Sequence, residues 1–216
     1  MLTRNFKQRM FVKKLNKALS EALLEAGFTE PTEVQQLCIP RIKSGADMVC
    51  IAPEGQGKTT MLVIGIIQRL TEALNDVPRA LVIVDSKERA LEIKAIFDLL
   101  GKNTNLRVFC SDVERKIEDQ RDKIYAGSDV IIGTAKRLNE LYSFSALNLS
   151  DLKMFVVDDA EIVMRQLITS QIDRLAGSIP KSQQLVFGSH NTDRIDRFIE
   201  LFMHNPTIIE ADDSEE

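Results

Sequence analysis

Residues 48–59, MVCIAPEGQGKT, decide the fold of this chain. The first five are apolar, which is a typical length for a buried strand, and a glycine-rich turn follows them. The turn ends in Gly57-Lys58-Thr59, and an apolar helical pattern begins directly afterwards. A strand, a glycine-rich loop and a helix in this order allow backbone amides and a helix N-terminus to surround phosphate groups. A glycine-rich turn that binds no ligand is the alternative.

Similar apolar runs recur along the chain, with longer helical patterns between them. They lie at 80–84, 106–110, 129–133, 154–158 and 184–188, and TIIEA at 207–211 adds a further strand. Strands that alternate with helices of this length imply crossover connections and a parallel sheet. We therefore expect an α/β fold, a doubly wound and mainly parallel sheet with helices on both faces.

Two helices are predicted before the first strand. Leu15, Leu19, Leu23 and Ala26 recur at helical spacing, so residues 12–26 should form an amphipathic helix that ends at Gly27. A second helix should follow Pro31. With no repeat or flexible linker in the sequence, we expect one domain over residues 1–210 and a disordered acidic tail at 211–216.

Composition indicates a soluble, cytoplasmic protein of 216 residues. The apolar runs are too short to span a membrane, and the N-terminus lacks the pattern of a secretory signal. Cys38, Cys50 and Cys110 have no metal-binding spacing, so we expect core residues in a reducing compartment and no zinc site. The net charge of −4 does not favour nucleic-acid binding, although basic side chains gather near the start, at Arg4, Lys7, Arg9, Lys13, Lys14 and Lys17. A solvated basic helix face also explains that cluster.

The glycine-rich loop predicts a site for ATP and Mg²⁺. Lys58 supplies a cation for the phosphates and Thr59 a hydroxyl for the metal ion. A phosphate-binding loop of this kind also needs a carboxylate at the end of another strand, which Asp158 provides, while Asp159 could orient a water for attack on the γ-phosphate. Acidic residues after a strand are also common helix caps, so the two aspartates alone do not decide the function.

At this point the motifs identify a resemblance. From Phe11 to Pro206, in motif order, the chain resembles the first RecA-like domain of DEAD-box RNA helicases. Residues 27–35, GFTEPTEVQ, look like that family's Q motif, which implies that Gln35 reads the adenine edge and that Phe28 packs on the base. Ala52, unusual in a general phosphate-binding loop, matches the family form. The nucleotide-binding residues implied are Phe28, Thr32, Gln35, Pro53, Glu54, Gly55, Gln56, Gly57, Lys58, Thr59 and Thr60.

The resemblance also implies an RNA site and a coupling site. Residues 85–90, DSKERA, occupy the place of the PTRELA motif, and residues 134–138, TAKRL, that of TPGRL. In the family these segments contact RNA phosphates, which points to Ser86, Lys87, Thr134 and Arg137. Glu161, Ser189 and Asn191 correspond to residues that couple ATP to RNA. Taken without the resemblance, the four RNA-contact candidates are ordinary surface polar residues.

Departures from the family pattern concern catalysis. The DEAD tetrad reads DDAE at 158–161 and the SAT motif reads SHN at 189–191. Asp159 is one methylene shorter than the family's glutamate, and a displacement of about 1 Å can cost about 100-fold in rate. The second RecA-like domain, which supplies arginine fingers in the family, is missing after Pro206, so hydrolysis should need that domain in cis or in trans. By itself the chain should hydrolyse ATP weakly or not at all.

Two other hypotheses remain open at this stage. The first is a non-catalytic adaptor of the same fold, in which nucleotide binding gates association with RNA or protein. The second is an unrelated P-loop kinase or small GTPase, although those proteins lack the segment around Gln35 before the loop.

Overall fold

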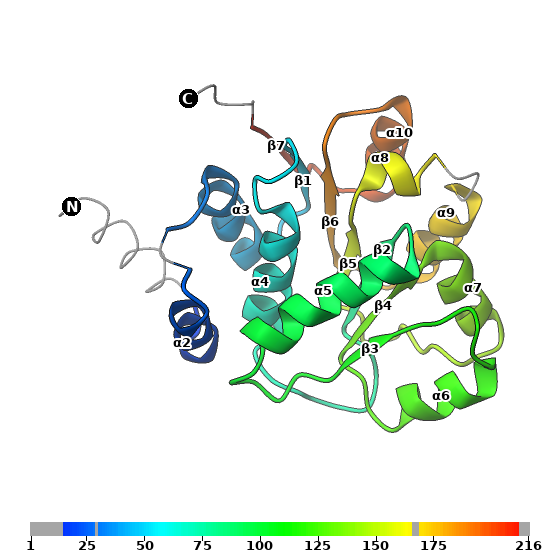
Figure 1. Cartoon of the computed structure of the whole chain (residues 1–216). Helices are drawn as coiled ribbons and strands as arrows, with labels where there is room; N and C mark the ends of the chain where they lie inside the picture. The colour runs from blue at the N-terminus through cyan, green and yellow to red at the C-terminus, as the bar shows by residue number, and fades with distance from the viewer. Residues whose placement is uncertain (1–14, 29, 166–168, 212–216) are drawn as a thin grey trace.

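The computed structural model describes residues 15–28, 30–165 and 169–211. Seven strands form one sheet in the order β3-β4-β2-β5-β6-β1-β7, and every neighbouring pair is parallel. The strands are β1 Met48–Ile51, β2 Ala80–Val84, β3 Val108–Cys110, β4 Val130–Thr134, β5 Met154–Val157, β6 Gln183–Gly188 and β7 Thr207–Glu210. The predicted α/β class with a parallel sheet is confirmed (Figure 1).

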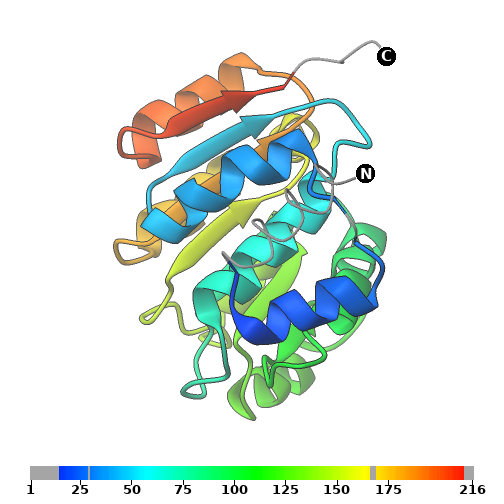
Figure 2. The same cartoon turned by 90° about the vertical axis from the view of Figure 1, so that its left-hand side faces the viewer.

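Helices cover both faces of the sheet (Figure 1). One face carries α2 Lys17–Glu25, α3 Glu33–Ser44, α4 Lys58–Leu70 and α5 Lys87–Leu100. The other carries α6 Ile117–Tyr125, α7 Ala135–Ser143, α8 Ala160–Val163, α9 Thr169–Ser178 and α10 Asp193–Phe202. Figure 2 looks onto the first face, where α3 and α4 cross in front of the sheet and β7 forms its edge.

Alternation along the strands divides the core into two layers. In β2, Ala80, Val82 and Val84 pack under α3 to α5, whereas Leu81 and Ile83 pack against the opposite helices. All five residues are buried, because a parallel sheet covered on both faces leaves neither side of a central strand in water. Cys38 and Cys50 are buried in the first layer, as predicted, and Cys110 is half-buried.

The first helix is shorter than the apolar spacing predicts. Helix α2 begins at Lys17 because the Asn16 side chain accepts a hydrogen bond from the Leu19 amide at 2.9 Å and caps the helix there. Leu15 therefore precedes the helix, although it is buried in the same layer. The chain leaves the helix at Gly27, whose φ of 78° lies in the left-handed region that glycine adopts most readily. The predicted helix over 12–26 is therefore wrong at its start: of the described residues, 15 and 16 precede the helix.

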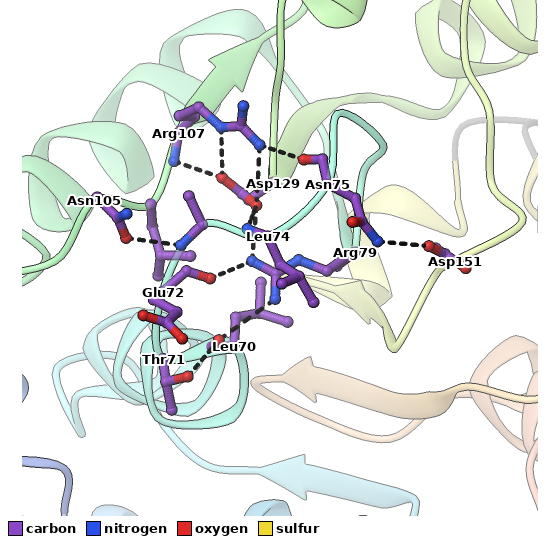
Figure 3. A network of polar contacts seen from close by, with 12 residues as sticks. Leu70, Thr71, Glu72, Leu74, Asn75, Arg79, Asn105, Arg107, Asp129 and Asp151 are labelled. Carbon is purple, nitrogen blue, oxygen red and sulfur yellow. Dashed lines mark hydrogen bonds and ion pairs between the residues drawn. The ribbon is translucent and has the colours of Figure 1, made fainter.

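A buried carboxylate ties three segments together at the amino end of the strands (Figure 3). Asp129, which directly precedes β4, accepts hydrogen bonds from Arg79 Nη2 at 2.7 Å and from Arg107 Nε at 2.9 Å. It also accepts from the backbone amides of Arg107 at 3.0 Å and Leu74 at 3.2 Å. These contacts fix the segment between α4 and β2 and the start of β3 relative to β4.

Several predictions fall outside the described residues. They concern the basic side chains from Arg4 to Lys14, the start of the family resemblance at Phe11, and the tail after Ala211. Lys17 is described, and its ammonium group lies 3.8 Å from Glu21 in an exposed pair. In the part of the chain that the structure covers, no helix is both long and apolar enough to span a membrane.

Candidate functional site

The predicted site lies at the carboxyl ends of the strands. Because all strands run in the same direction, the loops that follow β1, β2, β4, β5 and β6 meet at one edge of the sheet. In open parallel sheets this edge is where ligands bind. The sequence motifs at 52–59, 85–90, 134–138, 158–161 and 189–191 all follow one of these strands.

The loop between β1 and α4 has the shape of a phosphate cradle. Gly55 and Gly57 have φ values of 82° and 78°, which few other residues adopt without strain. Gly57 is the N-cap of α4, so the loop passes directly into a helix N-terminus. A cavity of about 430 Å³ opens here, lined by Glu54, Gly55, Gly57, Lys58, Thr59, Thr60, Arg89 and Asp159.

Lys58 lies against the loop itself in this structure. Its ammonium group donates to the backbone carbonyls of Ala52 and Pro53, the latter at 2.9 Å. The side chain is buried, yet it lines the cavity. Two of its three N–H donors therefore bind backbone carbonyls of the loop, and one is left for a phosphate oxygen.

The segment around Gln35 supports the loop from the side. Thr32 caps α3 and its hydroxyl donates to the Gln56 carbonyl at 3.0 Å, while Gln35 Oε1 accepts from the Thr32 amide at 3.2 Å. A side chain built at Gly57 would lie 3.0 Å from Gln35 Nε2, so the amide group sits against the loop. Gln35 is buried, and Phe28 is half-buried against the core of the same face. The structure thus brings Thr32 and Gln35 to the loop, while Phe28 packs on the core beside them in sequence.

Arg89 is a site residue that the sequence analysis did not single out. From the first turn of α5, its Nη2 donates to Thr59 Oγ1 at 2.6 Å and lies 3.1 Å from Asp159 Oδ2. Its Nε and Nη2 both contact Asp158 Oδ2, at 2.9 and 2.8 Å. The signal available in the sequence was the fifth letter of DSKERA, where PTRELA has leucine.

Burial and charge set the titration of this cluster. The pKa of Asp158 is raised to about 6, first by burial and then by the Asp159 carboxylate, with Arg89 offsetting part of the rise. Burial also raises the pKa of Asp159 against the opposing effect of Arg89. Burial disfavours the charged guanidinium, but the two aspartates outweigh it and the pKa of Arg89 is raised. The ion pairs of Arg89 with Asp158 and Asp159 thus stabilise three charged groups at a site that is largely shielded from water.

The predicted magnesium ligands do not fit a metal ion in this arrangement. A hydroxyl and a carboxylate oxygen are donors that Mg²⁺ prefers, and Thr59 and Asp158 do lie together. However, Thr59 Oγ1 and Asp158 Oδ2 are both bound by Arg89. Asp158 Oδ1 is buried without a hydrogen-bond partner among the described residues. Over the same residues, no cluster of three or more His, Cys, Asp or Glu side chains could hold a metal ion.

The predicted coupling residues are only partly brought together. Ser189, after β6, donates to Glu161 Oε1 at 2.5 Å, and Glu161 is buried. Asn191 instead bonds Asp196 Oδ1 at 2.8 Å, on the exposed start of α10. His190 Nε2 lies 3.2 Å from the Arg165 guanidinium. Of the three predicted coupling residues, Glu161 and Ser189 therefore contact each other, whereas Asn191 bonds a residue of α10.

The predicted RNA-binding residues lie on the same edge, but their polar groups are largely engaged. Ser86 and Thr134 cap α5 and α7, accepting from the amides three residues on. Lys87 Nζ lies 3.1 Å from Asp112 Oδ2 and 2.8 Å from Glu114 Oε2. Arg137 is buried, with 4% of its surface exposed, and donates to Glu140 at 2.7 Å and to the Arg115 carbonyl. The two helix N-termini remain as donors toward this edge.

Comparisons with known proteins agree with this geometry. The family model described as DEAD/DEAH box helicase matches residues 32–191. The ATP-dependent RNA helicase DBP10 of Pyricularia oryzae is 31% identical over 200 residues, 92% of this chain and 22% of that protein. The ATP-dependent rRNA helicase RRP3 of Scheffersomyces stipitis is 31% identical over 195 residues, 89% of this chain and 40% of that protein.

A solved structure has the same fold. The crystal structure of a DEAD box protein from the hyperthermophile Methanococcus jannaschii superimposes with a TM-score of 0.86 at 22% identity, covering 92% of this chain and 54% of that one. The chain spans less than half the length of the two curated relatives above. Because the family model covers well over half of its residues, this chain belongs to the DEAD/DEAH box helicase family.

Proposed function

We propose that the chain is the ATP-binding and RNA-binding first RecA-like domain of a cytoplasmic DEAD-box RNA helicase. The observation that carries this proposal is the loop at 52–57, which joins β1 to the N-terminus of α4 and opens into a cavity of about 430 Å³. Glycine φ values, an adjacent lysine and a helix N-terminus together favour a polyphosphate ligand. Free cysteines support a reducing compartment.

Adenine specificity in this proposal comes from the residues before the loop. Gln35 rests against Gly57, so its amide group is close to a nucleotide whose phosphates lie in the loop. Phe28 is half-buried against the core of the same face and leaves part of its ring for the base. Gln35 Oε1 already accepts a hydrogen bond from the Thr32 amide, which leaves its NH₂ group for the base. We therefore assign base recognition to Phe28 and Gln35.

RNA would bind as a backbone along the carboxyl edge. Helices α5 and α7 begin there, after Ser86 and Thr134, and their N-termini carry partial positive charge. Contacts of this kind to phosphates bind an RNA strand without recognising its base sequence. Lys87 would join them only by leaving Asp112 and Glu114, so RNA binding by this chain alone should be weak.

Hydrolysis in this proposal requires a second RecA-like domain, in cis or in trans. Asp159 lines the cavity with a φ of 46°, an uncommon value for a residue with a side chain, and Arg89 holds its carboxylate. Asp159 is the group that would orient the attacking water. We assign no metal-dependent step, because the donors predicted for Mg²⁺ are bound by Arg89.

ATP titration by calorimetry tests the proposal, with Lys58→Ala as the variant and Lys102→Ala as its control. Lys102 pairs with Glu25, and neither residue lines the cavity. We expect Lys58→Ala to weaken ATP binding by at least about tenfold, since a charge-assisted bond to phosphate is lost. Equal affinity in both variants would refute the nucleotide site. Turnover by the chain alone should stay near background even with single-stranded RNA; RNA-stimulated turnover would show that a second domain is not needed.

A further inference from the structure

Arg89 stands where the sequence motifs predict a divalent cation. Its guanidinium binds the Thr59 hydroxyl and the Asp158 carboxylate, the two groups predicted as metal ligands, and lies 3.1 Å from Asp159. We propose that Arg89 is the resident cation of the nucleotide site, so that this chain binds the polyphosphate of ATP or ADP without a divalent metal ion. The inference rests on the proposed nucleotide site.

The charge balance of the cluster favours the guanidinium over a metal ion. Asp158 is fully buried and Asp159 adjoins it, so the two carboxylates need a cation nearby. Arg89 supplies it permanently, because a guanidinium does not lose its proton in proteins. Mg²⁺ could use Asp158 Oδ2 and Thr59 Oγ1 only after Arg89 had left both, and it gives up its own water reluctantly. Asp158 Oδ1 has no partner among the described residues, but it belongs to the carboxylate that the guanidinium already neutralises.

The guanidinium also faces the ligand cavity. Arg89 lines the same cavity as Gly55, Gly57 and Lys58, and 23% of its side-chain surface is exposed. Of its five N–H donors, the one on Nε and both on Nη2 are engaged by Asp158, Thr59 and Asp159. Glu92, itself 63% exposed, binds Nη1 at 3.1 Å. One Nη1 donor therefore remains, and a phosphate can replace the exposed Glu92 at the other.

A purely structural role for Arg89 makes a different prediction. If the side chain only pins α5 to the loop, replacing it should lower the melting temperature without changing how nucleotide affinity responds to metal. If Arg89 is the site's cation, its removal should create a requirement for magnesium, because Thr59 and Asp158 become available as ligands.

The experiment compares ATP and ADP affinity in excess magnesium and in EDTA, by calorimetry. The wild-type ratio of the two dissociation constants should stay within about threefold. Arg89→Leu should bind ATP about tenfold to 100-fold more weakly in EDTA than in magnesium, since a charge-assisted contact has been lost. Lys94→Leu, which also replaces a cation of α5 by leucine, is the control: Lys94 pairs with Asp98 and does not line the cavity, so its ratio should equal the wild-type ratio.

A wild-type dissociation constant that rises tenfold or more on removal of magnesium would overturn the inference, whether or not Arg89→Leu folds. Equal ratios in wild type and in folded Arg89→Leu would do the same. In both cases ATP still binds, so the proposed function stands. Absence of ATP binding by folded wild-type protein in either buffer would instead overturn the proposed function, and the inference with it.

Discussion

Replacing Asp129 by alanine should remove a large part of the stability of this domain. The carboxylate is fully buried and is shared by Arg79 and Arg107 (Figure 3). The Arg79 side chain is 7% exposed and Arg107 is 34% exposed. Without Asp129 the first guanidinium would keep its bonds to the Leu70 and Glu72 carbonyls but stay buried without a negative charge beside it, while the second could reach water. Loss of Asp129 therefore strands one buried charge.

Breaking a buried pair from one side costs about 3–5 kcal/mol. For a domain of this length each kcal/mol lowers the melting temperature by about 2–4 °C, so Asp129→Ala should melt about 6–20 °C below the wild type. Asp76 is the matched control: it also binds Arg107, at 2.9 Å, but is 73% exposed. Because exposed pairs contribute little, Asp76→Ala should shift the melting temperature by no more than about 2–4 °C.

The pH dependence gives a second readout on the same variant. Burial by itself raises the pKa of Asp129, but hydrogen bonds from Arg107, Arg79 and the Leu74 amide outweigh it, so the pKa is lowered. A carboxylate with a lowered pKa contributes its full stability above the unfolded value of about 3.9 and loses it as the pH falls through the folded value. The difference between wild type and Asp129→Ala should be constant near neutral pH and shrink below about pH 4.

Thermal melts followed by circular dichroism, from neutral pH into the acid range, measure both effects. A melting temperature for Asp129→Ala within the range of Asp76→Ala would refute the reasoning, because it would mean that the Leu70 and Glu72 carbonyls or water stabilise Arg79 well enough without Asp129. A stability difference that grows on acidification would refute the assigned direction of the pKa shift.

Three further predictions test the core, the RNA edge and the loop. Ile131→Asp should prevent folding, judged by circular dichroism and soluble yield, since it buries an unpaired charge; a variant that melts like the wild type would contradict the strand assignment. Glu114→Gln should remove one of the two carboxylates that hold Lys87, leaving Asp112, and strengthen binding of single-stranded RNA in fluorescence anisotropy at low salt; unchanged affinity would mean that Lys87 does not face RNA. Gly57→Ala should weaken ATP binding by about tenfold or more in calorimetry, because its φ of 78° and its approach to Gln35 both disfavour a side chain; normal affinity would contradict this view of the loop.

Strand prediction succeeded because the buried strands are continuous apolar runs. Errors occur at the ends and have local causes. Residues 106–110 predict a strand, yet β3 begins at Val108, since the Arg107 amide donates to the Asp129 side chain rather than to a neighbouring strand. The strand predicted at 129–133 is shifted by one residue to Val130–Thr134 for the related reason that Asp129 belongs to that polar network. Apolar periodicity carries no information about such side-chain contacts.

Motif order placed the phosphate loop, Asp158 and Asp159 at one site, because each follows a strand and parallel strands end at the same edge. Motif order could not predict which polar side chains already have hydrogen-bond or ion-pair partners within the protein. Arg137 appears in the sequence as a surface donor, whereas the structure buries it against Glu140 and the Arg115 carbonyl. The partners of a side chain depend on neighbouring elements that no single motif contains.

Arg89 shows why the metal prediction depends on the sheet order. It is 30 residues from Thr59 and 69 from Asp158, and it reaches both only because β2 pairs with β5, so that α5 begins beside the end of β5. With leucine at that position, the hydroxyl and the carboxylate would face the cavity without a cation and would suit Mg²⁺. With arginine they already hold a positive charge. One side chain, carried by the helix after a neighbouring strand, thus decides whether this set of oxygen atoms binds a metal ion or a guanidinium.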